Sequence, residues 1–371
     1  MESIEEMTGA VVVFFMSFVS SIIAVALVLR LSHKKAWYDH INERKIHTGD
    51  IPRLGGFGFV TAFIIISFII NILSESGFEF RFLPSLLALI LIFVSGVYDD
   101  FRPLAPRYKL LIQVIAALCV ILPGYTFRRF LYLDGYFFSN VGWLRYPLTF
   151  FWIIGLTNAM NFIDGLDGLA GGLSFLAALT FALLSVSFSQ SAHTFLFCIC
   201  LAGVVAGFLV FNAPFPQAKI FMGDGGSQFL GFTLALIPLI EQENTPAALP
   251  VVYAAGLLAI PIFDTIAAVW RRVRDGRRID SPDKSHIHHK LINLRFSPRQ
   301  ADFMLWGLQT VLGVLVYCSV KFRGPLSLGL IISAYLITAA FFTVIHFLNR
   351  RAVKRFPQAE DPPDEVQIAS E

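Results

Sequence analysis

The sequence predicts an all-α polytopic membrane protein with about eleven transmembrane helices. Hydrophobic residues make up 56% of the chain and charged residues only 15%, whereas about 25% of the residues in a typical soluble domain are charged. Apolar runs near the length that crosses a bilayer recur along the chain. A chain of this composition needs a lipid bilayer around it, and its net charge of +3 gives no support for a nucleic-acid partner.

Eleven apolar runs account for the predicted helices. The first, residues 8–31, lacks a basic start and a small-residue cleavage site, so we expect a retained anchor and not a signal peptide. Two runs, 108–122 and 228–240, are shorter than the usual span of about 17–25 residues, and a re-entrant or interfacial placement is the alternative for both. The other runs lie at 56–73, 83–98, 143–160, 169–187, 194–211, 249–270, 303–320 and 326–347.

The basic residues predict the orientation of these helices. With the N-terminus outside, most of the 29 Lys and Arg residues fall on the side of the C-terminus, which is the bias of cytoplasmic loops. The C-terminus is then cytoplasmic. We expect residues 1–349 to form a single transmembrane domain that carries the functional loops. Residues 350–371, first basic and then acidic and proline-rich, are expected to form a disordered cytoplasmic tail.

Five polar stretches interrupt the apolar pattern, and the eleven-helix topology places all of them on the cytoplasmic side. A carboxylate beside hydrocarbon is unfavourable, by about 2.5–3.5 kcal/mol at mid-membrane. A solvated helix end explains any one stretch, but repetition on one side predicts a shared site. The stretches are IPRLGG at 51–56, YDD at 98–100, NAMNFIDGLDGLAGG at 158–172, FMGDGG at 221–226 and DSPDKSHIHHKL at 280–291.

The aspartates of these stretches predict a cation site. Asp99 and Asp100 end one predicted helix, and Asp164 and Asp167 are spaced to share a face if that segment is helical. Asp224 lies in a glycine turn whose backbone N–H groups are suited to phosphate, although an ordinary turn is the alternative. Carboxylates gathered on one face repel one another unless a cation lies between them. Oxygen ligands select Mg²⁺, or Mn²⁺.

Basic residues near these aspartates add candidate ligands for phosphate. Lys109 begins the helix that follows Asp99. It can neutralise a phosphate there, or its ammonium can reach the water at the membrane surface as an ordinary snorkelling lysine. His286, His288 and His289 show no HExxH spacing, so we expect them to hydrogen-bond phosphate or sugar, with an ordinary surface loop as the alternative. Asp264, inside a predicted helix, has either a functional role or a structural pairing with the arginines that follow it.

These motifs, taken together and in this order, resemble the polyprenyl-phosphate N-acetylhexosamine-1-phosphate transferases of glycosyltransferase family 4. The resemblance runs from about Lys45 to Gln300 and is strongest to the bacterial undecaprenyl-phosphate N-acetylglucosamine-1-phosphate transferases. It implies eleven helices, a UDP-N-acetylhexosamine donor, undecaprenyl phosphate as acceptor, and Mg²⁺. It also implies the bacterial inner membrane and an active site facing the cytoplasm. The oligomeric state stays open, with a homodimer as one possibility.

The resemblance implies a role for each matched residue. Catalytic roles fall on Asp99, Asp100, Lys109, Asp164, Asp167 and His286. Metal binding falls on Asn161, Asp224 and Asp99. Substrate binding falls on Arg272, His288, His289, Lys45 and Asp167, the last near the uridine.

Several alternatives remain at the level of sequence. Phospho-muramoyl-pentapeptide transferases place a lysine shortly after the paired aspartates, where this chain has Arg102 and Pro103. A secondary transporter would place its polar groups near mid-membrane, and a CDP-alcohol phosphotransferase would show a DGxxAR motif that is absent after Asp164. The implied transfer proceeds by direct attack of the lipid phosphate or through a covalent aspartyl intermediate. N-acetylgalactosamine and deoxy sugars, and the downstream polymer (O-antigen of lipopolysaccharide, common antigen, teichoic acid or capsule), also stay open.

Overall fold

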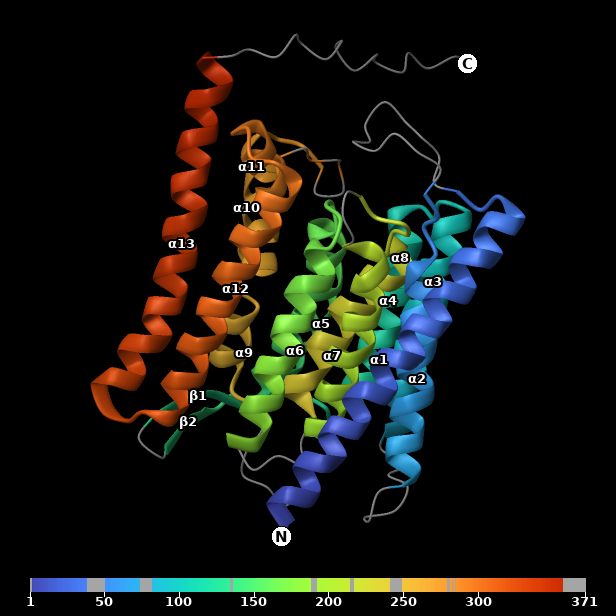
Figure 1. Ribbon diagram of the computed structural model, residues 1–371. Helices are drawn as coiled ribbons and strands as arrows, with labels where there is room; N and C mark the ends of the chain where they lie inside the picture. The colour runs from blue at the N-terminus through green and yellow to red at the C-terminus, as the bar shows by residue number, and fades with distance from the viewer. Residues whose placement is uncertain are drawn as a thin grey trace.

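The computed structural model is a bundle of long helices with one small hairpin at one end (Figure 1). It describes residues 2–38, 51–73, 82–133, 136–187, 192–213, 217–240, 249–278, 281, 283 and 285–355. The helices of its N-terminal half are α1 (Glu2–Lys35), α2 (Gly55–Ile72), α3 (Phe82–Phe101), α4 (Pro106–Ile121), α5 (Arg145–Ile163) and α6 (Leu169–Ser187). The remaining helices are α7 (Ala192–Asn212), α8 (Gly223–Leu236), α9 (Val251–Leu257), α10 (Ala259–Arg274), α11 (Ile287–Asn293), α12 (Pro298–Lys321) and α13 (Gly324–Arg355).

Each apolar run singled out in the sequence is helical over most of its length in the structure. Seven of the described helices are long and apolar enough to cross a membrane, and the bent pair α9–α10 would make an eighth. The seven lie within α1, α2, α3, α6, α7, α12 and α13. The protein is therefore a multi-pass membrane protein. Helix α13 continues to Arg355, beyond residue 350 where we expected the tail to begin.

The predicted helix at 249–270 is not continuous. It divides at Leu258 into α9 and α10, whose axes differ by 84°. Pro261 explains the break, because proline lacks an N–H and its ring clashes with the carbonyl four residues earlier. That carbonyl belongs to Leu257, and it accepts a hydrogen bond from Gln309 Nε2 of α12 at 3.0 Å. The polar group that the break releases is thus satisfied within the bundle.

A β-hairpin stands in the connection between α4 and α5, where the sequence analysis proposed no helix or strand. Strands β1 (Arg129–Leu133) and β2 (Tyr136–Asn140) pair antiparallel, with Leu133 opposite Tyr136. The hairpin is followed by a short 3₁₀ turn, η1 (Gly142–Leu144). An Asp-Gly pair between aromatic and apolar runs is a strong hairpin signal, and the sequence carries this pair at 134–135.

Helix α8 lies at the centre of the bundle and carries Asp224 in its first turn. It packs against α2, α3 and α5, and all of its residues from Gly225 to Leu236 are buried. Its Phe229 ring lies 5.4 Å from the Phe63 ring of α2. The helix ends in a second 3₁₀ turn, η2 (Ile237–Leu239). This packing fixes the N-terminal end of α8, where the polar residues gather.

Candidate active site

Asp100, at the end of α3, holds the first turn of α8. Its Oδ1 accepts a hydrogen bond from the backbone N–H of Asp224 at 2.8 Å, and its Oδ2 accepts one from Gly225 at 3.1 Å. The first N–H groups of a helix have no partner within the helix, so a carboxylate there satisfies them and interacts favourably with the helix dipole. Asp100 therefore sets the position of Asp224.

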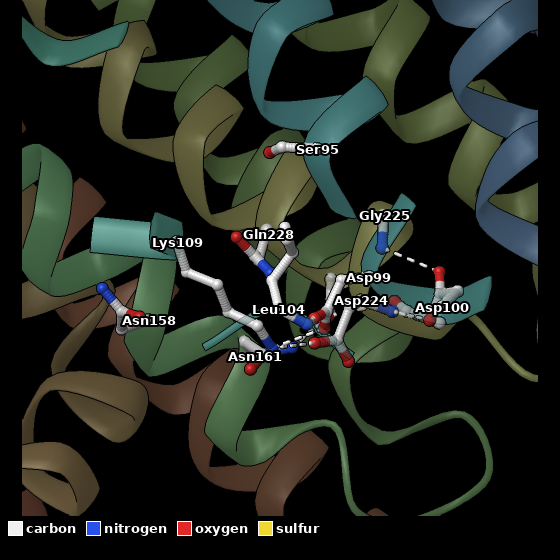
Figure 2. Close-up of polar contacts among 12 residues, drawn as sticks. Ser95, Asp99, Asp100, Leu104, Lys109, Asn158, Asn161, Asp224, Gly225 and Gln228 are labelled. Atoms are coloured by element: carbon white, nitrogen blue, oxygen red, sulfur yellow. Dashed lines mark hydrogen bonds and ion pairs between the residues drawn. The ribbon is translucent and has the colours of Figure 1, made fainter. Parts of the chain in front are cut away.

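Lys109 lies between two carboxylates that come from different helices. Its ammonium forms ion pairs with Asp99 Oδ2 and, at 3.1 Å, with Asp224 Oδ2. Figure 2 shows the Lys109 side chain extending from α4 to the point where Asp99 and Asp224 meet. The other oxygen of Asp99 accepts a hydrogen bond from the backbone N–H of Leu104 at 2.6 Å. Of the five aspartates that the sequence analysis grouped, Asp99 and Asp224 thus converge on Lys109.

Arg53 approaches the same cluster from the segment before α2. Its Nη2 lies 3.4 Å from Asp224 Oδ1 and 3.9 Å from Asp100 Oδ1. The sequence analysis singled out the IPRLGG stretch but gave Arg53 no role. An arginine beside a pair of glycines in one of the five polar stretches was the available signal.

Asn161 and a group of three amides, two of them buried, lie on the helices that carry the site residues. Asn161 Nδ2 donates to Ser227 Oγ at 2.9 Å, which fixes the orientation of its amide. Gln113 of α4 exchanges hydrogen bonds with Asn158 of α5 and donates to Gln228 of α8 at 3.3 Å. These amides join the three helices that carry Lys109, Asn161 and Asp224. Polar residues at helical spacing from these site residues were the sequence signal for this group.

Asp164 and Asp167 lie in the loop between α5 and α6, so the helical turn considered for them is wrong. Gly165 between them and Gly168 directly after Asp167 favour this irregular backbone. Asp167 Oδ2 accepts the backbone N–H of Ala218 at 2.9 Å, which ties the loop to the segment before α8. Burial, and then the negative charge of Asp224, raises the pKa of Asp164 to about 7. Asp164 is therefore close enough to Asp224 to share its electrostatic field.

The histidine stretch packs against this loop. A Cβ at Gly165 would overlap the His288 ring, so only glycine permits this contact. His288 is buried, and its Nδ1 has no hydrogen-bond partner among the described residues. Burial, and then His289 and His286, holds the pKa of His288 well below its ordinary value. A neutral imidazole at this position can either accept or donate a hydrogen bond.

His286 is positioned by a buried carboxylate of α10. Its Nδ1 lies 2.7 Å from Asp264 Oδ2, and Asp264 Oδ1 accepts the backbone N–H of Ile287 at 2.8 Å. Asp264 therefore holds the start of α11, a partner that the sequence analysis had not foreseen. The Arg272 guanidinium lies 5.8 Å from the centre of the Phe162 ring, next to the loop of Asp164. Lys45 lies outside the described residues.

The donor set at Asp99 and Asp224 suits a hard divalent cation. No group of three or more His, Cys, Asp or Glu side chains arranged for a metal ion occurs in the part of the chain that the structure describes. Mg²⁺ needs fewer protein ligands, because it usually binds through one or two carboxylates together with substrate phosphates. Two carboxylates already converge on the ammonium of Lys109, and the Asn161 amide from α5 lies beside them. These residues therefore fit Mg²⁺.

Comparisons with known proteins identify the family. The model of glycosyl transferase family 4 matches residues 82–241, which include Asp99, Lys109, Asp164 and Asp224. A probable undecaprenyl-phosphate N-acetylglucosaminyl 1-phosphate transferase of Bacillus subtilis is 35% identical over 305 residues, covering 81% of this chain and 82% of the relative.

Two further relatives cover most of the chain. An undecaprenyl-phosphate alpha-N-acetylglucosaminyl 1-phosphate transferase of Yersinia pestis is 30% identical, covering 78% of each chain. A decaprenyl-phosphate N-acetylglucosaminephosphotransferase of Mycobacterium leprae is 28% identical, covering 93% of this chain and 90% of the relative. The chain therefore belongs to glycosyl transferase family 4, as a polyprenyl-phosphate sugar-1-phosphate transferase of the kind that its motifs resemble.

Proposed function

We propose that this protein transfers N-acetylglucosamine-1-phosphate from UDP-N-acetylglucosamine to undecaprenyl phosphate and releases UMP. The observation that carries the proposal is the convergence of Asp99, Lys109 and Asp224 from three helices at one end of the bundle. The names of the relatives support the sugar and the lipid acceptor. Transfer of this kind is the first membrane step of a cell-surface polysaccharide pathway.

The reaction joins two anions, so the site must neutralise charge. An oxygen of the lipid phosphate attacks the β-phosphorus of the UDP-sugar, and the bond from that phosphorus to the bridging oxygen breaks as UMP leaves. Phosphoryl transfer depends mainly on positioning and electrostatic stabilisation. Mg²⁺, or Mn²⁺, held by Asp99, Asn161 and Asp224 would neutralise the pyrophosphate. Lys109, from its position between the two carboxylates, supplies a further positive charge to the phosphates.

The paired aspartates divide the work. Both oxygens of Asp100 accept backbone N–H groups of α8, so we assign it a positioning role. A carboxylate held in this way is poorly placed as a nucleophile, which favours direct attack by the lipid phosphate over an aspartyl intermediate. Asp99 faces Lys109 and takes the remaining proton of the lipid phosphate.

The sugar and the nucleotide lie on the side of the α5–α6 loop. We assign Asp167 to binding the uridine. We assign Asp164 to the electrostatic environment of the pyrophosphate. Arg272, His288 and His289 are assigned to the N-acetyl sugar, with His286 held in place by Asp264. Support comes from the packing of His288 on Gly165, which brings the histidine stretch to the aspartate loop.

The bilayer geometry follows from the helix ends. We propose that all eleven runs span, with the N-terminus outside and the C-terminus in the cytoplasm of a bacterial inner membrane. Residues 1–349 then form one catalytic domain, and residues 350–371 lie in the cytoplasm, where α13 continues to Arg355. The two described ends of the chain lie at opposite ends of the bundle in Figure 1. The basic last turns of α1 and α10 support a cytoplasmic site. The acceptor tail then stays in lipid while its phosphate meets a soluble nucleotide.

Product analysis with defined substrates tests this function. The purified protein is incubated with undecaprenyl phosphate, Mg²⁺ and a panel of UDP-sugars. The mass of the lipid product is then determined by mass spectrometry. We expect one product, undecaprenyl pyrophosphate linked to N-acetylglucosamine, and no product from the Asp224→Asn variant. Failure of every UDP-N-acetyl sugar, or acceptance only of the muramoyl pentapeptide nucleotide, would overturn the assignment.

A further inference from the structure

Backbone hydrogen bonds hold the segment of Arg53 against the segment that precedes Asp224. Phe221 donates its N–H to the carbonyl of Pro52 at 2.8 Å, and Gly55 donates to the carbonyl of Phe221 at 2.9 Å. Gly223 has a φ of +75°, and a Cβ there would overlap the carbonyl oxygen of Arg53. The segment before α2 and the segment before α8 therefore form one unit. A residue fixed in this way beside a reaction centre is suited to a specific contact.

The Asp224 carboxylate lies between two cations. The Arg53 guanidinium approaches Oδ1 at 3.4 Å, and the Lys109 ammonium approaches Oδ2 at 3.1 Å. The side chain of Arg53 is 37% exposed, whereas that of Asp100, which it also approaches, is 2% exposed. Arg53 thus stands at the rim of the site, where its side chain is partly exposed to solvent.

We propose that Arg53 binds a phosphate group of a substrate, and that Asp224 holds its guanidinium in place until a divalent cation binds to that carboxylate. The inference rests on the proposed function. A divalent cation at Asp224 repels the guanidinium and takes over the neutralisation of the carboxylate. The planar guanidinium then matches the geometry of a phosphate, to which it donates two parallel hydrogen bonds.

Two phosphates are candidates for this contact. The soluble donor carries a pyrophosphate, and the lipid acceptor carries a single phosphate at the membrane surface. Arg53 recognises the chemistry that the two share, and the Michaelis constants of the two substrates separate them. Loss of the guanidinium raises the KM of the substrate that it binds.

The test uses the full-length Arg53→Gln variant with Arg53→Lys beside it. Binding of Mn²⁺ is measured without nucleotide by electron paramagnetic resonance, and KM is measured for UDP-N-acetylglucosamine and for undecaprenyl phosphate. In Arg53→Gln we expect Mn²⁺ to bind roughly two- to five-fold more tightly, because a competing cation is gone. We expect one of the two KM values to rise on the order of 10- to 100-fold. Arg53→Lys, which keeps the charge but not the planar fork, should fall between.

Arg107→Gln is the matched control, since Arg107 stands at the same end of the bundle with its guanidinium 4.9 Å from the centre of the Tyr108 ring. It should leave both measurements near those of the unaltered protein. The inference is wrong if Arg53→Gln leaves both KM values unchanged, or if it weakens Mn²⁺ binding, as a purely structural role would. If Arg53→Gln does not fold, the KM values and the Mn²⁺ affinity of the Arg53→Lys variant decide in the same way. An unaltered protein that makes no lipid product would instead refute the proposed function.

Discussion

The carboxylate of Asp100 fixes the backbone of Asp224, whose N–H donates to Asp100 Oδ1 at 2.8 Å. The neighbouring Asp99 instead directs its side chain to Lys109. Adjacent carboxylates at one helix end therefore have different partners: Asp100 holds the start of α8, and Asp99 faces Lys109. This difference leads to separable predictions for the two residues.

Replacing Asp100 should reduce both stability and activity, whereas replacing Asp99 should mainly reduce activity. An asparagine at position 100 offers one acceptor oxygen in place of two, so a backbone N–H of α8 loses its partner. We expect Asp100→Asn to lower the free energy of unfolding by about 1–3 kcal/mol. Thermal denaturation in detergent, followed beside turnover, makes the comparison. Equal melting temperatures for Asp100→Asn and the unaltered protein would contradict the positioning role.

Lys109→Met should remove the cation that pairs with both Asp99 and Asp224 and leave Arg53 beside Asp224. Turnover should fall on the order of 10²–10³-fold, the usual effect of removing one electrostatic contact from a transition state. Mg²⁺ should raise the melting temperature of this variant more than that of the unaltered protein, because the metal would then supply the missing charge. Lys219→Met, at an exposed lysine, serves as the control. A smaller Mg²⁺ effect in Lys109→Met would argue against a shared cation.

Asp164→Asn should stabilise the metal-free protein, and the gain should increase with pH. The pKa of Asp164 in the folded protein is about 7, raised by burial and by Asp224 from the ordinary value of 3.8. Between these values the folded state binds more protons than the unfolded state, so stability falls as pH rises and the full penalty is present above pH 7. Melting temperatures at about pH 5.5 and pH 8 measure the effect. A gain that is larger at the lower pH would contradict this electrostatic account.

Gly165→Ala should impair the site through the His288 ring, which a Cβ at this position would overlap. We expect a loss of activity and a lower melting temperature, since overpacking typically destabilises a protein by about 1–3 kcal/mol. Gly155→Ala in α5 is the control, because a Cβ there meets nothing within 4 Å. The double variant Gly165→Ala with His288→Ala should recover much of the lost stability through the removal of the clash. Additive losses in the double variant would show that His288 is not the obstacle.

The sequence predicted the helices and the grouping of polar residues because both follow from local pattern. Apolar runs of spanning length identify helices, and the alternation of sides then brings Asp99, Asp164 and Asp224 to one end. Contacts between distant segments were not predictable in this way. Arg53 and Asp224 are 171 positions apart, and no spacing rule connects them.

The differences between prediction and structure have local physical causes. The bend at Leu258 arises from Pro261, whose effect inside an apolar run depends on whether Gln309 can satisfy the released carbonyl. The separation of roles between Asp99 and Asp100 depends on the docking of α8. The periodicity of the sequence does not predict this docking, because the docking depends on tertiary packing.

The transfer of the donor's β-phosphorus tests the central claim most directly. UDP-N-acetylglucosamine labelled with ³²P at the β-phosphate is incubated with the purified protein, Mg²⁺ and undecaprenyl phosphate, and the lipid and aqueous phases are counted. The account predicts that the label enters the lipid phase while unlabelled UMP appears in the aqueous phase. Label that stays in the aqueous phase as UDP, beside a glycosylated lipid, would mean that the sugar moves without its phosphate and would contradict the account.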